Sequence, residues 1–253
     1  MSSEFELVLV ILLAEAVPSA VFLYASYWAF VIRRALVSRM YRRQATWVGV
    51  LAAALAIFVF VTYSTNPLVT DLINVLTALL FALVFAYIDS SIPVIRRSDP
   101  LLRDILHWGT LRYFLWFDVG LLGFFNVAPG IIPSLSVGVT GYVFGVIGWL
   151  TSAFILFGLS GIAIFVGARR SGDIVLRSSL KWIGVLLLVT ILSFVVDTSE
   201  AALVTNLSYS TYDYFYSYAA LPGGAVYIVM GYCLYRAIRA LAPIGKILDD
   251  TRN

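Results

Sequence analysis

Charged residues are scarce in this chain of 253 residues. They make up 12% of it, whereas hydrophobic residues make up 61%. An ordinary soluble domain has roughly 25% charged and 45–50% apolar residues. So small a charged fraction cannot cover the surface of a water-soluble globule, and the lipid bilayer is the solvent that accommodates the excess of apolar side chains. The composition therefore predicts an integral membrane protein.

Cysteine and histidine each occur once, as Cys233 and His107. One cysteine excludes an internal disulfide, and the two residues together exclude a His/Cys metal cluster or a bis-histidine haem site within the chain. The sequence identifies no cofactor. The net charge is +3, but no basic patch is interleaved with aromatic residues and no nucleic-acid motif is present, so no nucleic-acid partner is predicted.

Lysine and arginine are absent from the first segment, Met1–Glu6, which carries Glu4 and Glu6. A secretory signal peptide needs a positively charged start, and the apolar run that follows is too long for one. We therefore expect this run to be a retained transmembrane helix.

Long apolar runs recur seven times, and a spanning helix needs about 20 apolar residues. The fourth run is the least regular, because it contains Arg112 and Asp118, and we expect Asp89 and Pro93 to end the third. The prediction is an all-α, polytopic membrane protein whose whole chain forms one bundle of seven transmembrane helices. The runs are Leu7–Ile32, Thr46–Thr62, Val69–Tyr87, Leu106–Val127, Val137–Val166, Leu176–Val196 and Tyr214–Tyr235.

Basic residues alternate between the two sets of loops, which predicts the orientation. They follow the first, third, fifth and seventh runs, while the other loops hold only acidic charges. Cytoplasmic loops carry the excess of Lys and Arg, so the N-terminus is predicted outside and the C-terminus in the cytoplasm. The basic residues are Arg33, Arg34, Arg39, Arg42, Arg43, Arg96, Arg97, Arg103, Arg169, Arg170, Arg177, Lys181, Arg236, Arg239, Lys246 and Arg252.

Two families with related features are excluded by residues that they require. Seven helices with the N-terminus outside is the ground plan of microbial rhodopsins, but the run Tyr214–Tyr235 has no lysine that could form a retinal Schiff base. The segment Gly158–Gly161 resembles the GxSG motif of rhomboid proteases, but no histidine follows residue 107. With no nucleophile–base pair, metal set or paired-acid motif, an intramembrane enzyme is the class with least support.

Two acids lie at similar depth within the predicted helices. Glu15 is about nine residues into the first, or ~14 Å from its outer end, and Asp118 lies ~12 Å below the same boundary in a core ~30 Å thick. A charge at mid-bilayer costs at least ~2.5–3.5 kcal/mol. The two acids are candidates for a proton-transfer or cation site, or they are hydrogen-bonded groups that only hold the bundle together.

Arg112 and His107 complete the polar residues of the fourth run. Arg112 cannot lose its proton and must either pair or extend to the cytoplasmic interface. Asp118 lies about 240° further around the helix, so a partner for Arg112 must come from another helix. His107 lies near the face of Asp118 at the cytoplasmic mouth, where it could take part in a proton path or simply be tolerated.

Helix-breaking residues suggest two irregular places. Pro18 follows Glu15 and removes the hydrogen bond to the carbonyl of Ala14, so we expect a kink beside Glu15. Pro222, Gly223 and Gly224 are predicted to interrupt the seventh helix. Glycines of the fifth run, including Gly158 and Gly161, are interpreted as sites of close helix packing.

These features support a transporter or channel for an ion, proton or small solute, with the intramembrane acids in its path. The alternative is a non-catalytic membrane subunit of a larger complex, or a seven-helix sensory module. The bilayer is the expected environment, and a homo-oligomer or a larger membrane complex is a possible assembly. The predicted location is a prokaryotic cell membrane.

Overall fold

The structure is a computed structural model, and it describes residues 9–10, 12–62, 67–98, 108–132, 147–170, 172–204 and 209–242. Within these ranges the secondary structure is helical. The helices are α2 (Val17–Ala35), α3 (Arg39–Thr62), α4 (Pro67–Ser98), α6 (Trp108–Ile131), α8 (Trp149–Ala153), α9 (Leu159–Arg170), α10 (Ile174–Val204) and α11 (Tyr209–Arg239), with the π-helical turns η1 (Leu12–Ala16) and η4 (Phe154–Gly158).

Because η1 continues into α2, and α8, η4 and α9 form one rod, these elements make seven long helical segments in the predicted order. Five of them are long and apolar enough to cross a membrane, namely Leu12–Ala35, Arg39–Val61, Leu150–Arg169, Ile174–Val196 and Leu221–Arg239. Helix α4 adds a shorter apolar stretch, Val75–Ser90. The prediction of a helical membrane protein is therefore supported by the fold.

Helix ends differ from the predicted ones mainly by extension. Helix α4 continues to Ser98, past Asp89 and Pro93, which were expected to end it. Helix α10 likewise continues to Val204. A helix satisfies its own backbone hydrogen bonds and can project beyond the apolar core, whereas hydropathy reports only the part inside that core. The predicted start of the fifth helix, at Val137, lies outside the described residues.

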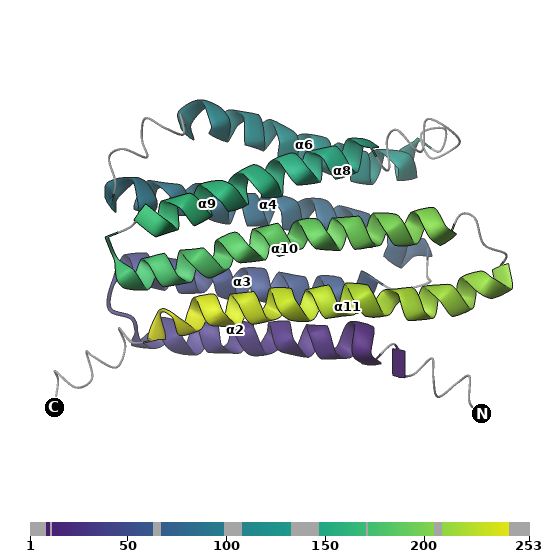
Figure 1. The fold of residues 1–253 in the computed structure, drawn as a ribbon, viewed down its shortest axis with the longest axis horizontal. Helices are drawn as coiled ribbons and strands as arrows, with labels where there is room; N and C mark the ends of the chain where they lie inside the picture. Colours follow the sequence, from purple (N-terminus) through teal and green to yellow (C-terminus); the bar gives the residue numbers. More distant parts are fainter. Residues whose placement is uncertain are drawn as a thin grey trace.

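The segments form a closed ring in chain order. Each one packs against the next, from α2 through α3, α4, α6, the α8–α9 rod and α10 to α11, and α11 returns to α2. Figure 1 shows the helices lying side by side, with α2, α4, α9 and α11 ending at the left. Contacts of α11 with α3 and of α4 with α9 cross the ring, so its middle is filled by side chains.

The core of the ring is apolar. Side chains of α3, α4, η4, α10 and α11 surround a cavity of about 40 Å³. Thr190 is the polar residue in its lining, and its hydroxyl already donates to the carbonyl of Leu186 at 2.9 Å. A water molecule needs two or more polar partners to be stable in a buried site, so this cavity is expected to be dry.

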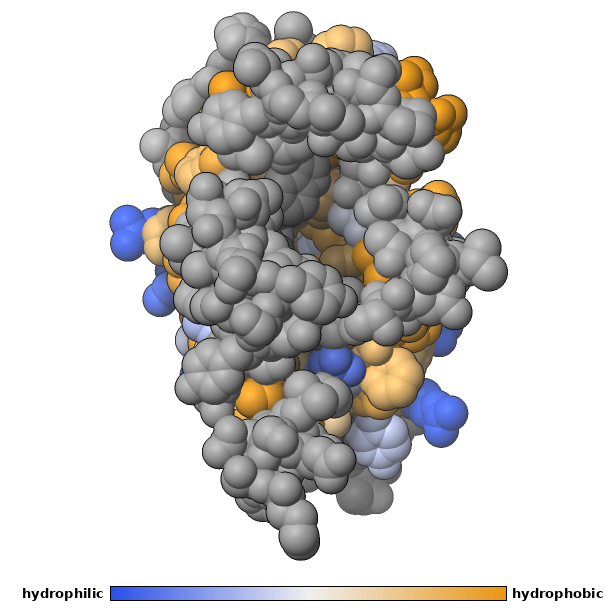
Figure 2. Space-filling view, turned by 90° about the vertical axis from the view of Figure 1, so that its right-hand side faces the viewer, coloured by the Kyte–Doolittle hydropathy of each residue, from blue (hydrophilic) through white to orange (hydrophobic). Residues whose placement is uncertain are grey.

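The outer flanks are apolar as well. Figure 2 looks along the helices from the right-hand end of Figure 1, and hydrophobic residues are visible at both flanks in that view, with some hydrophilic residues projecting among them. Leu23, Ile57, Phe60, Phe117 and Ile162 are among the exposed large apolar side chains. In water such a surface would be a liability, whereas in a bilayer it faces acyl chains.

Small and hydroxyl residues set the close contacts between helices. A Cβ atom on Gly49 of α3 would lie 3.1 Å from the Cβ of Ala29, so glycine allows α2 and α3 to approach closely. Across the same contact, Ser19 donates to the carbonyl of Ala56 at 3.2 Å and Ser26 to that of Gly49 at 2.9 Å. Small residues and buried hydroxyls are the usual means of helix association where water is absent.

The fifth and sixth segments pack in the same way. A Cβ atom on Gly161 would lie 3.3 Å from Leu187, and one on Gly184 would lie 3.3 Å from the carbonyl oxygen of Gly161. Gly161 therefore lies at a close contact between α9 and α10, in agreement with its interpretation as a helix-packing residue. Gly158 has more room, since its Cβ would lie 3.6 Å from the nearest atom, in Ile191.

Asp173 links the starts of two helices, α3 and α10, at one end of the bundle. Its Oδ1 accepts hydrogen bonds from the backbone N–H groups of Val175 and Leu176, each at 3.0 Å, and so caps the start of α10. Its Oδ2 accepts a hydrogen bond from the hydroxyl of Tyr41 on α3. One carboxylate therefore caps a helix and joins two segments that are far apart in the sequence.

We predict that Asp173→Ala lowers stability by roughly 1–2 kcal/mol, since it removes the cap as well as the contact with Tyr41. Tyr41→Phe removes only that contact and should cost about 1 kcal/mol or less. Thermal unfolding in mild detergent, followed by circular dichroism, measures both variants. Equal losses for the two would show that the cap contributes nothing.

Candidate functional site

The turn around Glu15 has an unusual helical geometry. Residues Leu12–Ala16 form the π-helical turn η1, and Pro18 follows within the first turn of α2. Proline lacks the N–H that would bond to the carbonyl of Ala14, and the wider π turn occurs directly before it. Beside Glu15, where the sequence predicts a kink, the structure has a π turn.

Helix α11 is continuous through Pro222, Gly223 and Gly224, so the interruption expected there does not occur. The structure gives Gly224 a different role. A Cβ atom on Gly224 would lie 2.8 Å from Cα of Ala14 and 3.2 Å from the carbonyl oxygen of Leu13. Only glycine lets the backbone of α11 come this close to η1. The turn beside Glu15 and the segment from Pro222 to Gly224, which the sequence predicts as two separate irregular places, therefore meet in one contact.

Glu15 lies on this turn but is not enclosed by it. Its side chain is partly exposed, and it has no hydrogen bond or ion pair with the described part of the chain. Its neighbours Val10 and Ala14 pack on Leu221 of α11 in a small apolar cluster. Glu15 therefore borders the contact between the first and last helices, and no polar partner for it lies within the described ranges.

Asp118 is enclosed. On α6 it is 2% exposed, and its carboxyl group is hydrogen-bonded to Ser152 of α8. Its Oδ2 atom has no hydrogen-bond partner among the described residues. Buried polar atoms are nearly always paired in proteins, so an unpaired carboxyl oxygen calls for a protonated group, a bound water or a bound ion.

The rod that supplies Ser152 is irregular directly after it. The π turn η4 spans Phe154–Gly158, and Ser160 follows at the start of α9. The hydroxyl of Ser160 is fully buried and has no partner in the part of the chain that is described. Isolated π turns inside helices are frequent at functional sites. Hydropathy does not identify Ser152 or Ser160, because single hydroxyl residues are common in apolar helices.

Arg112 pairs with Asp89 of α4. Its Nε atom lies 3.0 Å from Oδ2 of Asp89, and Trp116, one turn further along α6, donates to the same oxygen at 3.4 Å. The ring of Trp116 also packs edge-on against Phe85, at 4.8 Å between centroids. The partner on another helix is thus present. Asp89 was expected to end a helix but instead accepts bonds from both residues of α6.

The candidate residues do not form one site. The turn η1 packs against α2, α3 and α11, whereas α6, which carries Arg112 and Asp118, packs against α4, α8 and η4. Similar depth does not make Glu15 and Asp118 neighbours in the ring. His107 lies outside the described residues.

No group of three His, Cys, Asp or Glu side chains within the described ranges could hold a metal ion. Two cavities other than the central one lie at helix contacts. One, of about 340 Å³, is an apolar groove between α3 and α4, and the other, of about 450 Å³, lies over α10 and α11. Neither Glu15 nor Asp118 lines any of the three cavities.

We predict that Asp89→Asn and Arg112→Gln each lower stability by roughly 1–3 kcal/mol, because each leaves a charged partner unpaired. The double variant should lose less than the sum of the two, and the difference is the coupling energy of the pair. Arg34→Gln, which removes an exposed arginine from α2, is the matched control. Strictly additive losses in thermal or denaturant unfolding would contradict the pairing.

Comparison of the chain with protein-family models, with curated proteins and with solved structures finds no match. Its function is therefore inferred from the placement and chemistry of its own residues.

Proposed function

We propose that this membrane protein transfers a proton or a small monovalent cation, with Asp118 as the group that binds it. One observation carries the proposal: a carboxyl group that is 2% exposed has one oxygen atom with no partner among the described residues. In an apolar helix a carboxyl group of this kind is usually functional.

Charge balance supports the proposal. An ionised carboxylate in hydrocarbon needs a counter-charge, and Arg112 on the same helix is engaged by Asp89 on α4. Asp118 interacts with a neutral hydroxyl, that of Ser152. The carboxyl group is therefore expected to stay protonated or to hold a cation, and exchange of that proton or cation is the transfer step.

The neighbouring rod supplies polar groups for such exchange. Ser152 and Ser160 flank the π turn η4, and both are buried. Hydroxyl groups can donate and accept a hydrogen bond at once, so they can pass a proton or coordinate a small cation. A larger solute has no comparable support, since the central cavity is small and apolar.

The second candidate is a non-catalytic membrane subunit, alone as a homo-oligomer or within a larger complex. Its supporting observation is the packed, apolar interior, with no cavity at Asp118 among the three described above. In that case Asp118 and Ser152 would only join α6 to α8, as polar groups often do between helices in membranes.

We further propose that the end of the bundle rich in Lys and Arg faces the cytoplasm of a prokaryotic cell. Helices α2, α9 and α11 end there and α3 and α10 begin there, at the left of Figure 1. Their terminal turns carry Arg33, Arg34, Arg39, Arg42, Arg43, Arg169, Arg177, Lys181, Arg236 and Arg239. The positive-inside rule assigns such an end to the cytoplasm.

The transfer proposal predicts that Asp118→Asn abolishes flux while the protein stays folded. Asparagine keeps the size of aspartate and a hydrogen bond to Ser152, but it cannot carry a proton or charge. The measurement uses protein in sealed vesicles with a trapped pH-indicator dye, under an imposed pH gradient and then under a sodium or potassium gradient.

Two serines provide the matched comparison for that assay. Ser152→Ala should slow the flux, because it removes the partner of Asp118, whereas Ser19→Ala removes a buried hydrogen bond to the α3 backbone and should leave the flux unchanged. Flux that survives Asp118→Asn would refute the role of Asp118. Absence of flux in the unmodified protein would favour the subunit.

Labelling tests the orientation. Gly172, between α9 and α10, is exposed and has open space for a side chain, and Ile132 is exposed at the opposite end. A membrane-impermeant thiol reagent added outside should reach Ile132→Cys and should not reach Gly172→Cys. The native Cys233 is buried, so the unmodified protein should not react with the reagent and serves as the negative control. The reverse pattern would invert the proposed orientation.

A further inference from the structure

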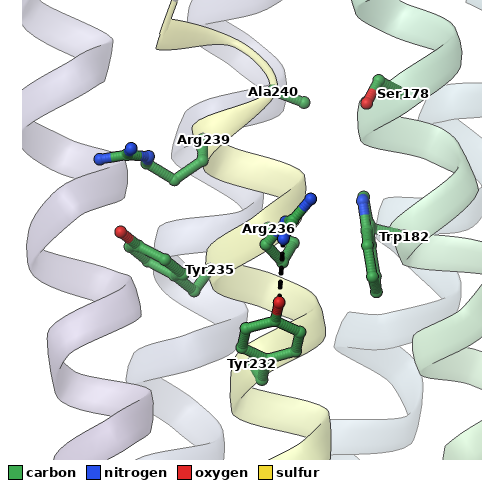
Figure 3. A pocket seen from close by; sticks show the side chains of 7 residues that line it. All are labelled: Ser178, Trp182, Tyr232, Tyr235, Arg236, Arg239 and Ala240. Atoms are coloured by element: carbon green, nitrogen blue, oxygen red, sulfur yellow. Dashed lines mark hydrogen bonds between the residues drawn. The ribbon is translucent and has the colours of Figure 1, made fainter.

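The groove of about 450 Å³ over α10 and α11 lies at the end of the bundle rich in Lys and Arg, and it combines cationic and aromatic side chains. Figure 3 shows Arg236 lying between the rings of Tyr232 and Trp182, with Arg239 on the next turn of α11. The lining residues are Ser178, Trp182, Tyr232, Tyr235, Arg236, Arg239 and Ala240. We propose that this groove binds the phosphate headgroup of an anionic phospholipid.

Arg236 is held in place while most of its donors stay available. Its Nη1 atom donates to the hydroxyl of Tyr232 at 2.9 Å, and its guanidinium carbon lies 4.9 Å from the ring of Trp182 and 5.7 Å from that of Tyr232. The two rings meet edge to face at 5.9 Å. A guanidinium has several N–H donors, and the fixed stacking leaves the others free to bind a phosphate.

Arg239 adds a second positive charge beside the first. It lies three residues after Arg236, on the same side of α11, with its guanidinium carbon 5.7 Å from the ring of Tyr235. Tyr235 is in turn packed on Tyr24 of α2. Neither arginine has a carboxylate partner within the described ranges. The positive charges of the two arginines also interact favourably with the negative C-terminal end of the α11 helix dipole. That interaction requires neither the groove nor the stacked aromatic rings.

The surroundings favour a lipid over free phosphate. Val229 lies two turns before Arg236 on the same face of α11 and is 46% exposed. Val185 and Val189 follow Trp182 on its face of α10 and are partly exposed. A phosphate on the guanidinium groups would thus place acyl chains along an aliphatic strip. Aromatic rings at this level match the belt at membrane interfaces, and basic pockets between transmembrane helices bind anionic headgroups.

The test uses the full chain in nanodiscs of phosphatidylcholine with a minor fraction of phosphatidylglycerol, and native mass spectrometry counts the lipids retained. Phosphatidylglycerol should be retained selectively. Arg236→Gln should weaken its retention about fivefold, and the double variant with Arg239→Gln should weaken it further. Tyr232→Phe keeps the aromatic ring but removes the hydrogen bond that positions the guanidinium of Arg236, so it should reduce lipid retention less than Arg236→Gln does.

Arg34→Gln is the matched control, since it removes an exposed arginine at the same end of the bundle but outside the groove. It should leave retention unchanged. An equal loss for Arg34→Gln and Arg236→Gln would overturn the site in favour of diffuse charge attraction. Displacement of the lipid by millimolar inorganic phosphate would overturn the lipid as the ligand. Circular dichroism and thermal unfolding verify that each variant is folded.

Discussion

Within the hydrocarbon of a bilayer no water is available to pair with a polar group, and most of this structure follows from that constraint. The backbone meets it by forming helices, whose hydrogen bonds are internal. Polar side chains meet it through partners on neighbouring helices. Ser19 and Ser26 bond to carbonyl groups of α3, and Arg112 bonds to Asp89. One oxygen atom of Asp118 is buried without a partner in the described part of the chain, as is the hydroxyl oxygen of Ser160.

The same constraint separates two acids of neighbouring helices, Asp89 of α4 and Asp118 of α6. Asp89 receives the positive charge of Arg112 and a bond from Trp116, so its negative charge is balanced where it lies. Asp118, on the helix that supplies both of those partners, interacts among the described residues with a neutral hydroxyl, that of Ser152. A protein that needed only to join α6 to its neighbours could do so with the first arrangement. The second arrangement is the one on which the proposed transfer role of Asp118 rests.

Much of the fold could be predicted from the sequence, because apolar length and the placement of basic residues are properties of single segments. The seven helices occur in the expected order, and pairing of Arg112 with a residue of another helix was one of the two alternatives that the sequence left open. The identity of that partner could not be predicted, since Asp89 also suits a helix end and pairing depends on which helices meet. The role of Ser152 as the partner of Asp118 could not be predicted either, for the same reason. The composition of the segment from Pro222 to Gly224 indicates an irregular backbone, and only the fold shows that it is a place of close approach between helices.

The contact between Gly224 and Ala14 also has a consequence for biosynthesis. Transmembrane helices enter the membrane in the order in which they are made, so α2 is inserted before α3 and long before α11. The ring closes only when α11 reaches η1, which makes this seam a contact of very large sequence separation. Contacts of this kind form late, because the intervening chain must first be ordered. Until then η1 lacks its contact with α11, and the ring stays open between α2 and α10.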